Sequence, residues 1–571
     1  MASPSSERDI REALETLAAA RPGFWSRTAC GVTRSLTPIP ALLDRNAYSA
    51  ESSRARILLV GGLSGDPADV DLALHALELY AGGGDGLALR VGLSAAPCAN
   101  PDGLRLGRGP DNGAGGSPSQ GYPPVGNFYF DERDPEKRYL WRWICFQAPD
   151  LVLEVRAGSG SVVWECNAAA RHLAPAVAAS REVREETLLK ALGEGYPEGL
   201  GTIPGLRLTA SDDQLSRELS RLFGAVRQEG LLGTSPARQT LAARRNRSRT
   251  EVARVLSLAY GHSFEPIVYT QGVPISGRLQ LAELDPSGGD PAPGIAALLG
   301  DFVDAVSGEF GEGMPPSALA SVVWGAELTS ATGDDRYANL IIEAANRFRP
   351  AEFEAAPSPC DPDFRTEDMF MAGAILGRAY QVTTENRYVD LLTAFLLDAK
   401  TQQDNGLFWH CRSAPFYWGR GNGFAAMGLA ETLTHLPEEH ANYPAVLAMY
   451  RKLMASLHGL QRQSGLLPQV LDFPGSYDEF TATCMTGYAM ARGLRLGWLD
   501  GDFRSSVELA WQAISERVDD VGNVVDACAS TGVQQNVRDY LDRPAIYGFD
   551  DRSGGFALWF ALEMERLTRG L

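Results

Sequence analysis

The chain lacks a surplus of basic residues and lacks any long apolar run, and both absences limit what it can do. Its 52 lysines and arginines against 71 aspartates and glutamates give a formal net charge of -19. This balance argues against nucleic acid or an anionic membrane as the main partner, so an anionic ligand would need a locally basic pocket. No run in the sequence approaches the roughly 20 apolar residues of a membrane span. We therefore expect no membrane contact.

Closely spaced cysteines and an apolar leader are also missing. The eight cysteines are scattered, without a Cys-x-x-Cys pair, and residues 1–10 show no apolar core of a signal peptide. Scattered thiols in a chain without a leader are typical of a reduced, cytoplasmic protein. We therefore expect a cytoplasmic location.

The chain is long enough for two or more domains, and its first half reads as an α/β domain. It has 571 residues, 44% apolar and 22% charged, as in globular proteins. Short apolar runs alternate with helical patterns from about residue 56 to 269, which predicts a parallel or mixed sheet with helices. The expected strands are Ile57–Val60, Leu87–Val91 and Leu151–Val155, and the expected helices are Ala68–Tyr80 and Glu185–Leu192.

From about Ala292 onward the pattern is helical and it repeats. Tight polar turns, each ending in an aromatic residue, separate pairs of apolar helices; the aromatic residues are Tyr337, Tyr388, Tyr443 and Phe503. Their intervals of 51, 55 and 60 residues (337 to 388, 388 to 443, 443 to 503) indicate an array of helical hairpins. We expect this array to close into an all-α, (α/α)6-type toroid.

The helical pattern predicts about ten helices, near 292–308, 317–331, 335–348, 367–381, 386–400, 421–435, 444–459, 479–496, 503–516 and 553–569. A six-hairpin toroid needs twelve helices. The sequence thus leaves room for an incomplete ring, with Gln271–Pro291 packing strands or loops across the gap. The predicted domains are 1–270 for the α/β part, 271–290 for a linker and 291–571 for the toroid.

A polar cluster begins the first helix of each hairpin. The clusters are Ser317, Thr366–Asp368, Trp418–Asn422, Asp478–Thr481 and Asp550–Ser553. If these helices form the inner ring, their N-terminal ends meet at one mouth, where unpaired N–H groups and partial positive charge suit a uronate carboxylate. Each residue taken alone also fits a simple helix cap, but five clusters at equivalent positions favour a binding site.

The densest cluster of this kind lies in Gly406–Gly428. This segment has six aromatic residues together with His410, Arg420 and Asn422 among glycines. Aromatic rings suit stacking on a sugar, and arginine suits holding a negative group. The same mixture suits a hydrophobic core poorly, because buried charges need partners.

Five segments between residues 290 and 571 resemble motifs of the unsaturated rhamnogalacturonyl and glucuronyl hydrolases, glycoside hydrolase families 105 and 88. They follow the family's order and are Glu367–Gly373, Gly406–His410, Trp418–Gly423, Gly465–Asp472 and Glu479–Met485. The resemblance implies hydration of a Δ4,5-unsaturated uronyl residue at a non-reducing end. In that reaction an acid protonates C4, water adds at C5, and the product collapses with release of the neighbouring sugar.

The same resemblance implies roles for individual residues. Glu367 stands at the position of the family's general acid/base, and Asp368 is one residue later, so either could donate the proton. That acid has to stay protonated near neutral pH, which requires burial or a like-charged neighbour. Arg420 would clamp the carboxylate, and the other expected substrate-binding residues are His410, Trp409, Trp418, Asn422, Tyr417, Gln469 and Thr481.

One departure from the family concerns its second essential aspartate. Alignment of the preceding hairpin puts Ser317 at about that position. Glu479, Asp550 and Asp551 are then the candidates for the second carboxylate. Hydrolysis of a saturated glucuronide by a carboxylate pair is the alternative reaction, and a non-catalytic carbohydrate-binding protein is another reading. In each case the expected partner is an oligosaccharide containing uronic acid, and a homodimer is compatible with the sequence.

Segments of the first half resemble the zinc carboxypeptidase (M14) fold in a familiar order. They are Arg56–Pro67, Ala99–Gly103, Gly126–Phe128 and Pro149–Val155. Zinc in that fold needs two histidines and a glutamate, but the corresponding positions are Ser64, Arg156 and Pro67. We therefore expect a degenerate domain without a metal, no cofactor, and no amide hydrolysis. The domain could shape the mouth of the toroid, bind sugar, build a dimer, or be retained for folding.

Overall fold

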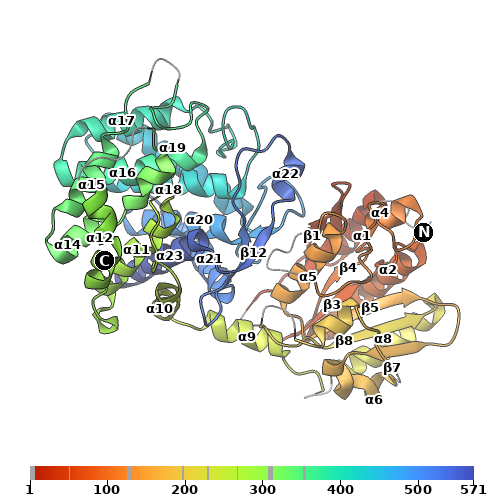
Figure 1. The fold of residues 1–571 in the computed structure, drawn as a ribbon. Helices are drawn as coiled ribbons and strands as arrows, with labels where there is room; N and C mark the ends of the chain where they lie inside the picture. Colours follow the sequence, from red (N-terminus) through yellow and green to blue (C-terminus); the bar gives the residue numbers. More distant parts are fainter. Residues whose placement is uncertain are drawn as a thin grey trace. The chain divides into compact units, whose positions relative to one another are not determined.

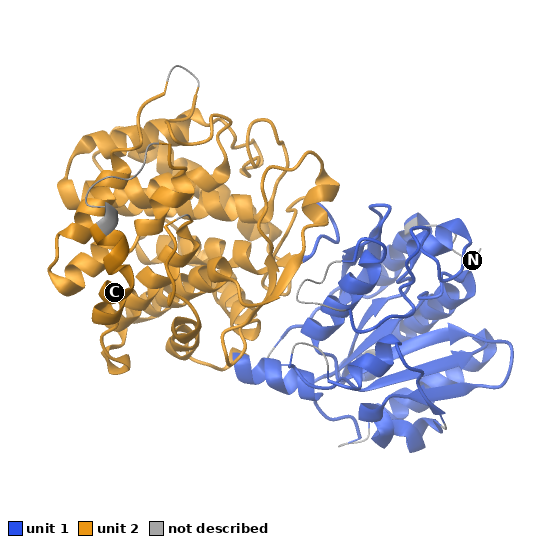
Figure 2. Ribbon diagram, in the orientation of Figure 1, with its two compact units in different colours: residues 1–244, 473–477 blue, residues 245–472, 478–571 orange. Residues whose placement is uncertain are grey.

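A computed structural model describes residues 7–49, 52–124, 131–179, 181–195, 199–227, 231–266, 268–306, 313–351 and 355–571. The chain forms two compact units (Figure 2): unit 1 is residues 1–244 with 473–477, and unit 2 is residues 245–472 with 478–571. The division therefore lies at residue 244, upstream of the boundary expected at 270. In the described part of the chain, no helix is long and apolar enough to cross a membrane.

Unit 1 is built on one eight-stranded mixed sheet in the order β1-β2-β4-β3-β5-β8-β6-β7 (Figure 1). Its central pairs β3–β4, β3–β5 and β5–β8 are parallel, whereas β1–β2, β2–β4 and β6–β8 are antiparallel. The strands are β1 (Trp25–Val32), β2 (Pro38–Asp44), β3 (Ala55–Val60), β4 (Val91–Ala96), β5 (Leu151–Ala157), β6 (Val163–Cys166), β7 (Arg181–Glu182) and β8 (Gly205–Ala210). The α/β prediction with a mixed sheet is confirmed.

Most helices of unit 1 connect these strands, and the others precede the first strand or follow the last one in sequence. They are α1 (Glu7–Ala20), α2 (Pro67–Gly82), α3 (Asp85–Ala88), α4 (Pro101–Leu106), α5 (Pro135–Gln147), α6 (Ala174–Val177), α7 (Leu188–Leu192), α8 (Asp212–Val226) and α9 (Pro236–Arg245). Two predicted bounds were wrong. The strand expected at Leu87–Val91 begins only at Val91, because the residues before it belong to helix α3 and a turn. The helix expected at Glu185–Leu192 is shorter and covers only Leu188–Leu192.

Unit 2 is helical. Its helices are α10 (Arg249–Ala259), α11 (Tyr269–Leu284), α12 (Ala292–Val306), α13 (Pro316–Leu319), α14 (Gly325–Thr332), α15 (Arg336–Ala345), α16 (Thr366–Thr383), α17 (Asn386–Asp398), α18 (Gly419–His435), α19 (Tyr443–Leu460), α20 (Phe480–Arg495), α21 (Arg504–Glu516), α22 (Val537–Leu541) and α23 (Asp551–Arg569). Short strands β9 (Leu467–Pro468), β10 (Asp478–Glu479), β11 (Val524–Cys528) and β12 (Ala545–Gly548) form two small sheets, and η3 (Ala320–Val322) continues α13.

Alternate helices of unit 2 close into an inner ring. α11 packs on α13 and η3, which pack on α16; α16 packs on α18, α18 on α20, α20 on α23, and α23 returns to α11 (Figure 1). α12, α15, α17, α19 and α21 lie between them in sequence, and α10 packs on α23. This is a toroid of six hairpins, and the ring is complete rather than open.

The ring closes because Gln271–Pro291 is mostly helix, not the expected linker of strands or loops. The sequence conceals α11 because Gly272 and Pro274 in its interior normally disfavour a helix. Gly272 is required by close packing: a Cβ there would lie 2.2 Å from the carbonyl oxygen of Ser321 in η3. The residues that hide this helix thus let it approach its neighbour in the ring.

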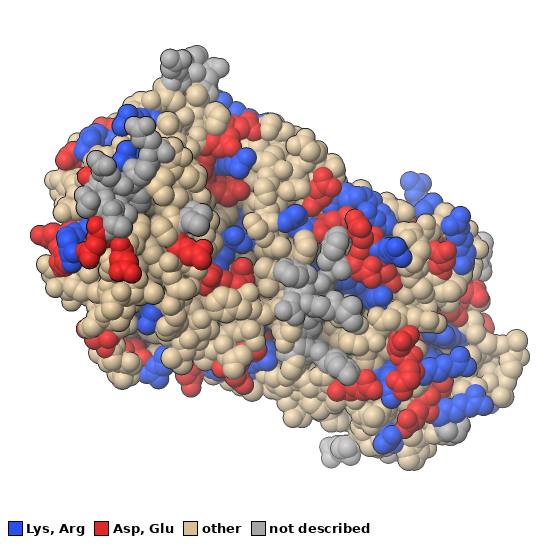
Figure 3. All heavy atoms as spheres, in the orientation of Figure 1, with Lys and Arg blue, Asp and Glu red and all other residues tan. Residues whose placement is uncertain are grey.

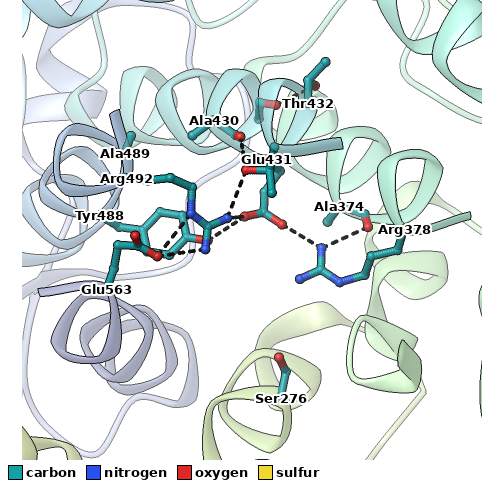
Figure 4. A network of polar contacts seen from close by, with 12 residues as sticks. Ser276, Ala374, Arg378, Ala430, Glu431, Thr432, Tyr488, Ala489, Arg492 and Glu563 are labelled. Atoms are coloured by element: carbon teal, nitrogen blue, oxygen red, sulfur yellow. Dashed lines mark hydrogen bonds and ion pairs between the residues drawn. The ribbon is translucent and has the colours of Figure 1, made fainter. Parts of the chain in front are cut away.

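The centre of the ring is filled by aromatic rings and, beyond them, by buried charges. Rings of Tyr269, Phe370, Phe424 and Phe556 lie within about 6 Å of one another. The charges lie in the C-terminal halves of the inner helices (Figure 4), where Glu431 accepts hydrogen bonds from Arg378 at 2.6 Å and Arg492 at 2.7 Å. Burial opposes ionisation of Glu431, but these two guanidinium groups hold its pKa at about 2. Arg492 also donates to Glu563 of α23 at 2.9 Å. The network therefore joins α16, α18, α20 and α23 through paired charges.

Candidate active site

A cavity of about 280 Å³ opens at the N-terminal ends of the inner helices. Its size is near the lower end of the roughly 300–1,000 Å³ typical of small-ligand sites. It is lined by Tyr269 of α11, Pro315, Pro316 and Ser317 of α13, Pro359, Asp361, Arg365, Glu367, Asp368 and Met371 around α16, Trp418, Arg420 and Phe424 of α18, Ser530 and Thr531, and Arg552 of α23. Four of the five predicted polar clusters thus contribute to one cavity, and Asp478–Thr481 does not.

The helix ends around the cavity differ in how they are capped. No described side chain caps α16 or α18, whereas Glu479 caps α20 and Asp550 caps α23. Backbone carbonyls take part of this role, because the Thr366 N–H donates to the His410 carbonyl at 3.0 Å and the Gly419 N–H to the Gln469 carbonyl at 2.8 Å. The positive end of each helix dipole is still not offset by a capping carboxylate. The two helices that carry Glu367 and Arg420 therefore favour an anionic ligand through their dipoles rather than through free N–H groups.

Glu367 and Asp368 lie next to each other in the cavity wall, and their surroundings shift their pKa values in opposite directions. The Asp368 side chain is 6% exposed, and one oxygen accepts the Asp361 backbone N–H at 2.7 Å. Burial and the neighbouring Glu367 charge raise the pKa of Asp368 to about 7. Burial would also raise the pKa of Glu367, but the facing His410 holds it below its usual value. One carboxyl is thus set to keep its proton near neutral pH and the other to lose it.

His410 lies behind Glu367 and not in the cavity wall. Its ring is completely buried, with Nε2 at 3.1 Å from both Glu367 carboxylate oxygens and Nδ1 at 2.5 Å from the Tyr540 hydroxyl. The Trp418 ring packs against the imidazole at 4.6 Å between centroids. His410 was predicted to contact the sugar directly, but it is absent from the cavity wall and its imidazole meets the cavity through Glu367.

Arg420 lies in the cavity wall, but its guanidinium is partly engaged by protein. Its Nη1 donates to the Cys528 carbonyl and its Nη2 to the Ala529 carbonyl at 2.8 Å, and it packs on the Trp418 ring at 4.9 Å. Among the described residues, Arg420 Nε and Trp418 Nε1 have no hydrogen-bond partner although both atoms are buried. Buried donors without partners are costly, so these two N–H groups are suited to ligand oxygens.

Two carboxylates predicted to be catalytic, Glu479 and Asp550, cap helices. Glu479 Oε1 accepts the backbone N–H groups of Thr481 at 3.0 Å and Cys528 at 2.8 Å, and Oε2 accepts that of Ala482. Asp550 accepts the backbone N–H of Ser553 at 2.9 Å. Neither lines the cavity. Both carboxylates thus make the cap contacts that the sequence left open, and a catalytic role for either stays a prediction.

Five predicted substrate-binding residues are also absent from the cavity wall: Trp409, Tyr417, Asn422, Gln469 and Thr481. Asn422 is completely buried and exchanges hydrogen bonds with the Phe408 backbone at 2.8 and 2.9 Å, which joins α18 to the preceding loop. Gln469 donates to the Tyr540 carbonyl at 3.1 Å, and Thr481 pairs with Ser553 at 2.8 Å. The side chains of Asn422, Gln469 and Thr481 thus join the elements that surround the cavity.

Ser317 does line the cavity, with Pro315 and Pro316 beside it. The position where the resemblance expects a second aspartate is thus at the site but carries a neutral hydroxyl. The sequence missed Tyr269, Ser530, Thr531 and Tyr540 altogether. Tyr269 was hidden by the unrecognised helix α11, and residues 530–540 follow a short strand with no motif of their own.

The positions that correspond to zinc ligands in unit 1 do not fit a metal. Ser64 hydrogen-bonds Asp69, Pro67 begins α2, and Arg156 donates to Glu154 at 2.6 Å. Gly126–Phe128 lies outside the described residues. Within the residues that the structure describes, no group of three or more His, Cys, Asp and Glu side chains could hold a metal ion.

Acidic and basic side chains are interspersed on the face of the molecule shown in Figure 3.

Comparison with known proteins points to one family. The model of Glycosyl Hydrolase Family 88 matches residues 326–568. The Unsaturated rhamnogalacturonyl hydrolase YesR of Bacillus subtilis is 26% identical over 300 residues, which are 48% of this chain and 84% of that protein. Protein Atu3128 of Agrobacterium fabrum is 31% identical over 161 residues, which are 25% of this chain and 68% of that protein.

Solved structures are similar as well. A family 105 glycoside hydrolase of C. acetobutylicum superposes with a TM-score of 0.46 at 18% identity, covering 55% of this chain and 99% of that chain.

Proposed function

Residues 326–568 belong to glycosyl hydrolase family 88, and from this premise we propose that the chain removes a terminal Δ4,5-unsaturated uronyl residue from an oligosaccharide. The observation that carries the proposal is the adjacent pair Glu367 and Asp368 in one cavity. Their surroundings push the two pKa values apart, to about 7 for Asp368 and below the usual range for Glu367. Such a pair supplies an acid and a base at the same pH.

In the proposed reaction, protonated Asp368 transfers its proton to C4 of the vinyl ether. Water adds at C5, and the Glu367 carboxylate takes the proton that this water loses. The resulting hemiketal opens, and the ring-opened product loses the neighbouring sugar at C1. Transfer of a proton from Glu367 back to Asp368 restores the starting state, so the cycle consumes only water.

The cavity wall offers suitable groups for the uronyl carboxylate. Arg420 uses two of its five N–H groups on the carbonyls of Cys528 and Ala529, which leaves Nε–H and one N–H on each terminal nitrogen. Trp418, the N-cap residue of α18, also lines the cavity, and its Nε1–H has no partner among the described residues. These donors favour an anionic sugar over a neutral one.

Lyase-generated oligosaccharides provide the test. Unsaturated products of pectin, ulvan and glycosaminoglycans would be mixed with the protein, and loss of the absorbance of the conjugated C4=C5 bond would be followed. We expect the absorbance to fall with the wild type and not with Asp368→Asn. An unchanged absorbance with every unsaturated substrate would refute the proposal.

Ser317 supports a second candidate, hydrolysis of a saturated glucuronide. The cavity lacks the family's second aspartate at that position, but three carboxyl groups line it, those of Asp361, Glu367 and Asp368, and ordinary glycoside hydrolysis needs two. Release of glucuronate from saturated substrates, with no change in unsaturated ones, would favour this reaction.

A further inference from the structure

A buried chain of hydrogen bonds leads from Glu367 away from the cavity. His410 Nε2 lies 3.1 Å from both Glu367 oxygens, and His410 Nδ1 lies 2.5 Å from the Tyr540 hydroxyl. The Tyr540 hydroxyl in turn accepts the backbone N–H of Gln534 at 3.2 Å. His410 and Tyr540 are both completely buried, and neither lines the cavity.

The donors and acceptors in this chain determine where the protons lie. Because the Tyr540 oxygen already accepts the Gln534 N–H, its own O–H is available to donate to His410 Nδ1. An accepting Nδ1 places the imidazole proton on Nε2, which then donates to Glu367. Burial raises the pKa of the Tyr540 phenol, so it keeps its proton. This arrangement gives the hydroxyl, the imidazole N–H and the carboxylate each a partner.

The imidazole ring is also fixed in orientation. The His410 backbone N–H donates to the Phe416 carbonyl at 3.1 Å, and its carbonyl accepts the N–H of Thr366 at 3.0 Å. Thr366 is the first residue of α16, directly before Glu367. With Trp418 packed on the ring, a flip of the imidazole would lose both side-chain bonds. Only the position of the imidazole proton, on Nδ1 or on Nε2, is then left open. Tyr540 contacts Nδ1, so its hydroxyl determines which of the two nitrogens carries the proton.

We propose that Tyr540 is a positioning residue, which sets the tautomer of His410 and thereby keeps Glu367 ionised beside protonated Asp368. The inference rests on the proposed function of the Glu367–Asp368 pair and assigns it a partner outside the cavity. Tyr540 belongs to α22, in the segment between β11 and β12 that also supplies Ser530 and Thr531 to the cavity wall.

Other charged and titratable groups also act on this chain and define the controls. Glu367 interacts electrostatically with Asp368 of α16, with Arg365 at the N-cap of α16 and with Tyr269 of α11. Tyr540 interacts in the same way with Cys411, Arg365 and Glu367. Arg420 and Arg552 lie in the same cavity wall. None of these is changed by removal of the Tyr540 hydroxyl, so Tyr540→Phe alters only the link to His410 and Gln534.

The consequence of Tyr540→Phe has a definite sign. Without the phenol donor, the imidazole proton can move to Nδ1, and the Nε2 lone pair then faces the Glu367 carboxylate. Repulsion between them raises the pKa of Glu367, so the ionised form is lost at a higher pH. We expect the acid limb of the kcat/KM profile to move up by about one pH unit, a tenfold loss of activity below the limb. Activity well above the limb should change less.

Tyr450→Phe is the matched control. Tyr450 is also completely buried, and its hydroxyl donates to the Ala489 carbonyl at 2.7 Å, outside the cavity. It should lower thermal stability without moving the pH profile. If Tyr540→Phe leaves the acid limb in place, or if both variants shift it equally, the positioning role is refuted.

A spectroscopic readout separates this inference from the proposed function. Full-length protein labelled with ¹⁵N only at histidine would report the His410 tautomer, with the signal identified by its loss in His410→Gln. We expect the Nε2–H tautomer in the wild type and a change in Tyr540→Phe. An Nδ1–H or imidazolium signal in the wild type at neutral pH, or an unaltered signal in the variant, would overturn the inference even if no uronide is ever cleaved.

Discussion

The carboxyl group of Asp368 lies where its charged form is disfavoured, so a substitution there changes stability as well as activity. Its side chain is 6% exposed, it lies beside the Glu367 carboxylate, and its one described hydrogen bond comes from the Asp361 backbone. An asparagine can accept the same N–H at nearly the same volume. Asp368→Asn therefore removes the ionisable group and little else.

The size of the effect follows from the pKa of Asp368. That pKa is about 7 in the folded protein against an ordinary value of 3.8, so the folded chain binds this proton more tightly than the unfolded chain does. The part of the free energy of unfolding that this proton contributes is therefore present below pH 3.8 and is lost as the pH rises to about 7. The interval of about 3 units corresponds to at most about 4 kcal/mol at pH 8. Asn avoids this cost, and we expect a gain of about 1–3 kcal/mol because an amide replaces the acid imperfectly.

Glu367→Gln should act in the opposite direction. His410 and the other local contacts hold the pKa of Glu367 below its usual value, so ionised Glu367 stabilises the fold above that value and the benefit is lost as the pH falls through the folded pKa. Glutamine removes this contribution at neutral pH and loses the charge-assisted bond to His410. Two neighbouring neutralising substitutions should thus shift the melting temperature in opposite directions.

Thermal unfolding of the wild type and both variants at pH 5 and pH 8 is the assay, with uronide turnover measured on the same samples. Asp368→Asn should be inactive and melt above the wild type, with the larger gain at pH 8. Glu367→Gln should be inactive and melt below the wild type at pH 8. If Asp368→Asn melts lower than the wild type at pH 8, or keeps full activity, our assignment of the proton donor is wrong.

Three further substitutions address other parts of unit 2. Arg420→Ala should raise KM for uronides by roughly tenfold to a hundredfold, since it removes a charged ligand contact worth about 1.5–3 kcal/mol; an unchanged KM in steady-state kinetics would exclude Arg420 from the site. Glu479→Gln should destabilise by about 1–3 kcal/mol because it weakens the cap of α20, while KM stays the same; a selective loss of kcat at unchanged melting temperature would restore a catalytic role. Glu431→Gln should cost about 3–5 kcal/mol in denaturant unfolding, because two buried arginines lose their shared partner, and a neutral result would show that the network of Figure 4 is dispensable.

Sequence periodicity predicted the helical half well where the helices are amphipathic or apolar throughout. Nine of the ten predicted helices of the toroid correspond to single helices of similar bounds, namely α12, α15, α16, α17, α18, α19, α20, α21 and α23. The tenth, 317–331, is broken into α13, η3 and α14. The ring nevertheless looked incomplete, because the packing reason for Gly272 lies in Ser321, a residue distant in sequence.

The candidate site was predictable in position but not in its division of roles. Helix-starting polar clusters located the cavity, since N-terminal ends of inner helices meet there. Which polar residue faces a ligand and which caps a helix depends on the side-chain direction in the first turn, and Glu479 and Asp368 have equally polar sequence contexts. Tyr540 could not be found at all, because its link to His410 spans 130 residues along the chain.

Adjacent carboxyl groups on a helix normally point about 100° apart, which argues against their sharing one site. Glu367 and Asp368 escape this limit because they are the second and third residues of α16, and the cavity lies over the end of the helix rather than along its side. Glu367 leans toward His410 and Asp368 toward the Asp361 backbone, and both line the space between. A helix end can therefore place two carboxyl groups with different pKa values in one cavity at consecutive positions. In the proposed function these two groups supply the carboxyl pair, although Ser317 is neutral.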